Sequence, residues 1–181
     1  MKNLFRDKAR DNLTVSLNAI GVQAAISGRG RSEEKIENSW YQRSLGIIDI
    51  AEGPVRWINV LKKDRGKHDP PKWWLVLCIP DENLVAFHHG LKIKTVRRKT
   101  FPLFGKIIDV TWKGQDGGTG LVDKLSSDVA IKVLAKRIGN LEIKHQADEF
   151  QGWTLTIDRK FVPCSEDWQT SRRIARLIIS S

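Results

Sequence analysis

Hydrophobic residues alternate with polar ones through the middle of the chain, whereas near both ends they recur at helical spacing. Between residues 46 and 112, short apolar runs are separated by turn residues such as Glu52, Gly53 and Pro54. Runs of this length and alternation are typical of β-strands. The predicted strands are residues 47–51, 55–61, 72–79, 84–88, 91–98 and 106–112.

Residues 72–79 are apolar on both alternating sets, with Trp73 on one set and Trp74 on the other. A strand that is apolar on both faces belongs in the middle of a sheet covered on both sides. Large aromatic side chains contribute much of the apolar area of a core. We therefore expect most of the seven tryptophans to be structural. For Trp40 and Trp57, a stacking site is the alternative to a core position.

The segment that precedes these strands contains two candidate helices. Residues 11–26 fit both a helical and an alternating pattern, and their length favours a helix. Ser32 is a candidate N-cap, because serine hydroxyls accept hydrogen bonds from the first turn of a helix. The short helix that it would begin carries Ile36 and Trp40 and ends near Gly46.

The last third of the chain mixes helices and strands. Residues 121–138 have helical spacing and are followed by Gly139, a residue that commonly ends a helix. Residues 141–144 and 153–158 resemble a strand pair, and Ser165 begins an amphipathic terminal helix.

Strands in the centre and helices at both ends predict an α+β fold with a mainly antiparallel sheet. The sheet is expected from residues 46–112 and 140–159, with N-terminal helices, a helix near 121–138 and a C-terminal helix. A length of 181 residues predicts one domain, residues 1–181. A small C-terminal subdomain, residues 115–181, is the alternative.

No motif matches a protein family at defined positions. The succession of strands followed by a terminal helix that carries Trp168 is similar in outline to pleckstrin-homology-like domains. This likeness concerns architecture, and it implies no role for any residue.

Composition indicates a basic protein of the cytoplasm. Lysine and arginine total 31 against 21 acidic residues, a net charge of +10, which favours anionic partners. Two cysteines predict no disulfide framework and favour a reducing compartment, with a Cys78–Cys164 bridge as the alternative. No apolar run approaches the roughly 20 residues that cross a bilayer, so no transmembrane segment is expected.

The positive charge is concentrated in one stretch of the sequence. Residues 84–108 contain no Asp or Glu but six Lys and Arg residues. On a strand, alternate residues share a face, and a stripe of cations can contact phosphates. Nearby phenylalanines, Phe101 and Phe104, are candidates to stack on exposed bases. Lysines that protect an edge strand from aggregation are the alternative explanation. The predicted binding residues are Lys92, Lys94, Arg97, Arg98 and Lys99.

Three other patterns resemble functional sites, but none of them predicts a function. The glycine-rich loop at 114–120 lacks both the dinucleotide and the phosphate-loop spacing, so a flexible surface loop is expected, with anion binding as the alternative. His88 and His89 are neighbours, which point to opposite faces of a strand and do not share a metal. Cys164 with His145 as its base lacks a supporting motif.

The leading hypothesis is a non-enzymatic binding or accessory domain, without cofactor or metal, that contacts nucleic acid or an anionic membrane surface. The enzyme alternative is a metal-dependent phosphodiesterase or nuclease. Its candidate residues are Asp109 with Lys113, or Asp49 with Glu52, because carboxylates beside a cation can hold a divalent ion and orient water. A protein–protein adaptor with no polyanion ligand is the third possibility.

Overall fold

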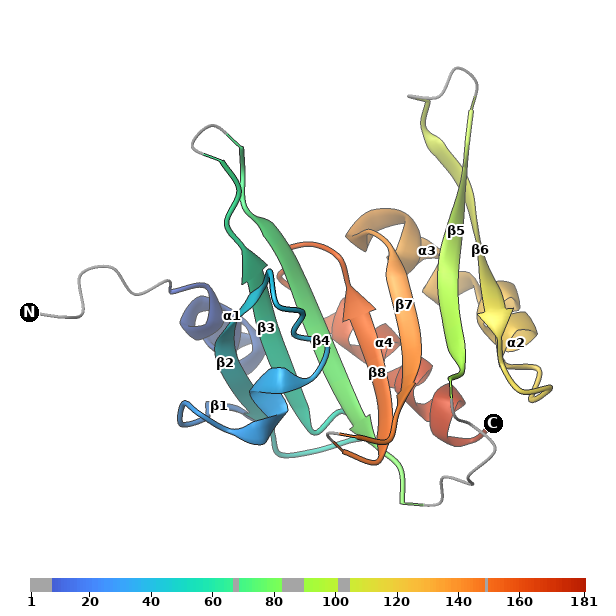
Figure 1. Cartoon of the computed structure of the whole chain (residues 1–181). Coiled ribbons are helices and arrows are strands. Elements are labelled where there is room, and N and C mark those ends of the chain that lie inside the picture. Colours follow the sequence, from blue (N-terminus) through green and yellow to red (C-terminus); the bar gives the residue numbers. More distant parts are fainter. Residues whose placement is uncertain (1–7, 67–68, 83–89, 101–104, 149) are drawn as a thin grey trace, which may run out of the picture.

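The computed structural model describes residues 8–66, 69–82, 90–100, 105–148 and 150–181. One antiparallel sheet of eight strands runs through this part of the chain, with four α-helices against one of its faces (Figure 1). The predicted α+β class with a mainly antiparallel sheet is confirmed.

The strands follow the order β1-β2-β3-β4-β8-β7-β5-β6 across the sheet. Their bounds are β1 Ala24–Ile26, β2 Arg43–Ile50, β3 Trp57–Lys63, β4 Lys72–Pro80, β5 Lys92–Lys99, β6 Ile107–Gln115, β7 Leu141–Gln146 and β8 Gly152–Ile157. The first four strands and the β5–β6 hairpin are therefore separated by β8 and β7, which come from the last third of the chain. The alternating pattern predicts the strands but not this insertion, because pattern carries no information about pairing between distant segments.

The helices pack their apolar sides against one face of the sheet. They are α1 Ala9–Ala19, α2 Leu121–Ser127, α3 Val129–Ile138 and α4 Ser165–Ile179. Leu17 of α1 and Ile174 of α4 are fully buried in the same cluster as Ile58 and Leu75 of the sheet. This cluster between helices and sheet is the main hydrophobic core, as the amphipathic pattern of the helices requires.

Two expectations for the N-terminal segment are corrected. Residues 11–26 are predicted to be one helix, but the helix ends at Ala19 and strand β1 follows at Ala24–Ile26. The segment therefore contains a helix and then a strand. The helix predicted from Ser32 is a 3-10 helix, η1, that spans only Ser32–Lys35. Trp40 lies beyond it and is 95% exposed, so it is not part of the core. The strand predicted at 84–88 lies outside the described residues.

The second face of the sheet, opposite the helices, is called the open face below. Over β3 and β4 it is covered by the segment that contains η1, shown in front of the sheet in Figure 1. Ile36 from this segment is fully buried against Leu61, Val76 and Cys78. Strand β4 is thus buried on both faces at the centre of the sheet, which confirms the prediction from its sequence.

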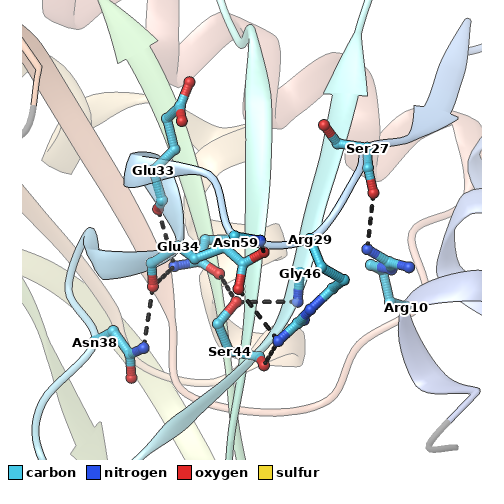
Figure 2. Close-up of polar contacts among 10 residues, drawn as sticks. Arg10, Ser27, Arg29, Glu33, Glu34, Asn38, Ser44, Gly46 and Asn59 are labelled. Carbon is cyan, nitrogen blue, oxygen red and sulfur yellow. Dashed lines mark hydrogen bonds and ion pairs between the residues drawn. The ribbon is translucent and has the colours of Figure 1, made fainter.

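Asn59 on β3 fixes the covering segment to the open face (Figure 2). Its side chain is completely buried, and its Nδ2 group donates to the carbonyl oxygens of Glu33, Glu34 and Ile36 at 3.3, 3.2 and 3.0 Å. The Ser44 hydroxyl donates to the Asn59 Oδ1 atom at 2.7 Å. A buried amide that uses its donors and its acceptor in this way specifies one position for the segment.

Candidate functional site

The site begins where strands β5 and β7 separate. Strand β5 pairs with β6 along its whole length but with β7 only over Lys92 to Lys94. At the next position, hydrogen bonds from the Thr95 side chain replace the backbone hydrogen bonds between the two strands. Its Oγ1 atom accepts from the Leu141 N–H at 2.9 Å and donates to the Leu141 carbonyl at 3.3 Å. Beyond Thr95, β5 and β6 rise away from β7 (Figure 1).

This separation leaves a cleft of about 560 Å³. That volume lies within the range of about 300–1,000 Å³ that ligand sites occupy. Strand β4 contributes Lys72 and Trp74, and β5 contributes 94–97. The rest of the lining is 140–142 at the start of and just before β7, Thr156 on β8, and Asp158 just after β8. The cleft is therefore built from four strands, one of which belongs to the N-terminal half of the sheet.

Neither of the two lysines that line the cleft has a carboxylate partner among the described residues. Lys94 is exposed, and its neighbours in register on the open face are Lys113 on β6 and Glu142 on β7. Lys72 lies over the Trp74 ring, with its Nζ atom 5.0 Å from the ring centroid. Both ammonium groups are available to a negatively charged ligand.

Arg97 lies at the edge of the cleft but projects toward the helices. Its Nη2 atom donates to the Ala135 carbonyl of α3 at 2.6 Å, while its Nε atom is buried and has no hydrogen-bond partner within the described structure. Burial, followed by repulsion from Arg159, lowers the pKa of Arg97, although Asp158 acts in the opposite direction. The guanidinium is therefore a cation that lacks a full counter-charge, and a nearby anion would stabilise it.

The two carboxylates that line the cleft are already partnered. Glu142 contacts the Nζ atoms of Lys92 and Lys144 at 2.9 and 3.1 Å. Burial raises the pKa of Glu142, but the hydrogen bonds from the two lysines outweigh it, so the net pKa is lowered and the group is ionised. Asp158 accepts from the backbone and side-chain N–H groups of Asn140 at 2.8 and 2.7 Å. The acids therefore shape the cleft, while Lys72 and Lys94 supply its surplus positive charge.

The structure brings together some of the five predicted binding residues. Lys92, Lys94 and Arg98 share the open face, because the residues between them, Ile93 and Thr95, are buried on the helix side. Among the five, Lys94 and Arg97 line the cleft. Lys92 is paired with Glu142, and the Arg98 guanidinium is 3.9 Å from Asp109. The fifth residue, Lys99, is exposed at the end of β5.

The arginines of α4 belong to the other side of the sheet. Arg173 is paired with Asp128 at 2.6 Å, and α4 packs against α2 and α3. These arginines therefore do not extend the cationic surface of the open face.

Lys72 and Trp74 are not among the binding residues that the sequence predicts. Because they are two residues apart on a strand, their common face could have been read from the alternation. Lys72 and Trp74 line the same cleft as Lys94 because β8 and β7 lie between β4 and β5 in the sheet. No local pattern in the sequence indicates this insertion.

In the glycine-rich loop, backbone N–H groups bind a carboxylate of the protein itself. The Asp116 carboxylate accepts from the backbone N–H groups of Gly118 and Val122 at 3.0 and 3.1 Å. These hydrogen bonds, led by the one from Val122, outweigh burial and lower the pKa of Asp116. The amides at the start of α2 are thus engaged by the protein itself, as in an Asx turn.

The two cysteines are free: Cys78 is buried in β4, and Cys164 is exposed at the start of α4. Burial raises the pKa of the Cys78 thiol well above its ordinary value. His145, the candidate base for Cys164, lies against Trp153 on β8, with their ring centroids 5.4 Å apart. His88 and His89 lie outside the described residues.

Asp49 and Asp109, the aspartates of the two alternative enzyme sites, both have cationic neighbours. Asp49 on β2 is paired with Arg31 at 2.7 Å, and the Asp109 carboxylate on β6 lies 3.9 Å from Arg98 and from Lys132. The described part of the chain contains no group of three or more His, Cys, Asp or Glu side chains that could hold a metal ion.

Comparison with protein-family models, with curated proteins and with solved structures gives no match for this chain. Within the described residues, no helix combines the length and apolar character needed to cross a membrane.

Proposed function

We propose that this protein is a non-enzymatic module that binds a phosphate-bearing polymer in the cleft between β4 and β5. The observation that carries the proposal is the pairing of charges in the cleft. Both carboxylates, Glu142 and Asp158, have partners, whereas Lys72 and Lys94 face the cleft without one among the described residues. An anion that enters meets two available ammonium groups.

The recessed shape favours a polymer over an anionic membrane surface. Lys94 and Lys72 line a concave site. The flat surface of a bilayer does not follow such a hollow, whereas a single chain of phosphates does. We also propose a cytoplasmic location, which the two free cysteines support.

The test is the salt dependence of binding to a fluorescent oligonucleotide. Each phosphate contact that is lost makes the slope of log affinity against log salt shallower by about 0.7 for a single strand. The double variant Lys72→Gln, Lys94→Gln should therefore reduce the slope by about 1.4 and leave the circular dichroism spectrum unchanged.

The matched control is Lys124→Gln, Lys136→Gln. It removes the same net charge from the last turn of α2 and the exposed side of α3. The proposal is refuted if both double variants change the slope equally, or if the wild-type protein binds no polyanion. Binding to phosphatidylserine vesicles that depends on Lys72 and Lys94 would instead assign the cleft to a membrane surface.

A further inference from the structure

On the open face, a lysine ammonium group lies over each of two aromatic rings. The Lys63 Nζ atom lies 4.5 Å from the centroid of the Tyr41 ring, and the Lys72 Nζ atom lies 5.0 Å from the centroid of the Trp74 ring. Lys63 and Lys72 are partners in register on β3 and β4. The side chains Tyr41, Lys63, Lys72 and Trp74 therefore form a line that leads to the cleft, and we call it the aromatic track.

Trp74 connects the track to the cleft. On one side it packs against the small buried cluster around Leu61 and Val76, and on the other side it lines the cleft. Its indole is thus held in place by packing while part of its ring remains accessible. A fixed and accessible aromatic ring is suited to stacking on a planar group.

The far end of the track is exposed but held in position. Tyr41 is 43% exposed, and Trp40, whose ring centroid is 5.6 Å from that of Tyr41, is 95% exposed. Their segment is fixed by Asn59 and by Glu37, whose carboxylate lies 2.6 Å from both the Lys144 Nζ and the Gln146 Nε2 atoms of β7. Large aromatic side chains that remain exposed on a fixed backbone are characteristic of binding surfaces.

Beyond the cleft, the positive charge continues to the edge of the sheet. Lys94 on β5 is in register with Lys113 on β6, and both are exposed. From Lys63 on β3 to Lys113 on β6 there are five steps between neighbouring strands. Lys63 is in register with Lys72, whereas the row of Lys113 crosses β4 at Val76, four residues further along that strand. With strands about 4.8 Å apart and residues about 3.3 Å apart along a strand, the path is about 27 Å long. At about 3.4 Å for each stacked nucleotide, this corresponds to about eight nucleotides.

We infer that the ligand of the cleft is a single-stranded nucleic acid whose bases stack on Trp74 and Tyr41 while its phosphates contact the lysines of the path. This inference rests on the proposed function, which by itself requires only the cations. The aromatic rings allow the site to distinguish a single strand from a duplex. Only unpaired bases expose their faces for stacking, because a duplex buries them. Alternating aromatic and cationic side chains along a groove are the arrangement that binds single strands without sequence preference.

The experiment compares two polyanions, a fluorescent ten-residue oligothymidylate and inorganic polyphosphate, on three variants. Trp74→Leu should weaken oligothymidylate binding by about 5- to 100-fold, the contribution of one stacked base, and change polyphosphate binding by less than about twofold. Trp74→Phe should recover part of the loss. Trp73→Leu is the matched control, because Trp73 also lies beneath lysine ammonium groups, those of Lys62 and Lys160, but packs against the helix-side core.

Tyr41→Ala provides a second test at an exposed position where folding is not at risk, and it should reduce oligothymidylate affinity by about fivefold, while Tyr41→Phe should not. Affinity should rise with oligothymidylate length and level off near about eight residues, and a duplex of equal length should bind more weakly.

The outcomes separate this inference from the proposed function. If wild-type protein binds neither polyanion, the proposed function fails. If it binds both and Trp74→Leu weakens both equally, or neither, the cleft binds polyanions but the stacking inference is overturned. Equal affinity for duplex and single strand would overturn it as well.

Discussion

The hydrogen bonds of Asn59 allow the stability of the covering segment to be worked out from individual atoms. In Asn59→Leu the branched shape of the side chain is kept, but the amide is lost. The Glu33 and Glu34 carbonyls retain partners, the Ile36 N–H at 3.2 Å and the Asn38 side chain at 3.0 Å. The Ile36 carbonyl loses the only partner recorded for it in the described residues, and the Ser44 hydroxyl loses its acceptor.

Each buried group left without a partner costs about 1–3 kcal/mol. Leucine beside the apolar cluster of Ile36 and Val76 offsets part of this, so we expect the free energy of unfolding to fall by about 2–4 kcal/mol. For a chain of this length, a loss of about 3 kcal/mol lowers Tm by about 6–12 °C. Urea unfolding followed by tryptophan fluorescence gives the free energy, and hydrogen exchange should show faster exchange of amides in residues 32–42.

Asn12→Leu is the matched control, because Asn12 is exposed on α1 and its side chain makes no hydrogen bond within the described residues. It should change stability by less than about 0.5 kcal/mol. If Asn59→Leu also changes stability by less than about 0.5 kcal/mol, then the segment is held by Ile36 alone and the reasoning from the amide is wrong.

Two further predictions concern acid stability and the β5–β6 pair. The hydrogen bond from Arg31 holds the pKa of Glu33 at about 2, below its ordinary 4.5, so this contribution to stability is present above pH 4.5 and is lost as the pH falls toward 2. Arg31→Gln should therefore flatten the dependence of unfolding free energy on pH across that window, and a curve parallel to that of the wild type would contradict the assignment. Gly114→Ala places a Cβ against the Lys92 carbonyl and 2.8 Å from the Ile93 Cα atom, at a φ of +146°, and should cost at least about 2 kcal/mol in thermal or urea unfolding. Gly118→Ala, with a φ of +79° and open space around it, should cost about 1 kcal/mol, and equal losses would mean that the clash with β5 is absent.

The elements of the fold are well predicted by local pattern. Strand β4 was recognised as central because both of its alternating sets are apolar, and the end of α3 follows from Gly139, whose φ is +114°. Both signals act within a few residues, so the sequence alone contains them. The helix predicted from Ser32 was wrong because apolar residues at helical spacing also occur where one residue, Ile36, anchors an irregular segment.

The candidate site is predicted less well, because it depends on which strands become neighbours. The charge run around Lys94 drew attention to β5, but the same alternation could not show that Arg97 faces α3 or that Lys92 is paired with Glu142. Trp74 was read as a core residue, and half of that interpretation holds, because it both packs against buried residues and lines the cleft. The positions of these side chains depend on which strands pair, and the paired strands are distant in sequence. A local pattern in one sequence does not specify such pairing.

The position of β7 and β8 has a consequence for how the chain is assembled. When β4 has emerged from the ribosome, its outer edge lacks the strand that will cover it until residues 152–157 have been made. During that interval an apolar strand with unpaired backbone groups is open to pairing with other chains, which is a recognised route to aggregation. We expect a chain that stops before Leu141 to be insoluble, since its two groups of strands would lack the pair that joins them. Release of such a truncated product in soluble, monomeric form would show that the two halves of the sheet fold independently.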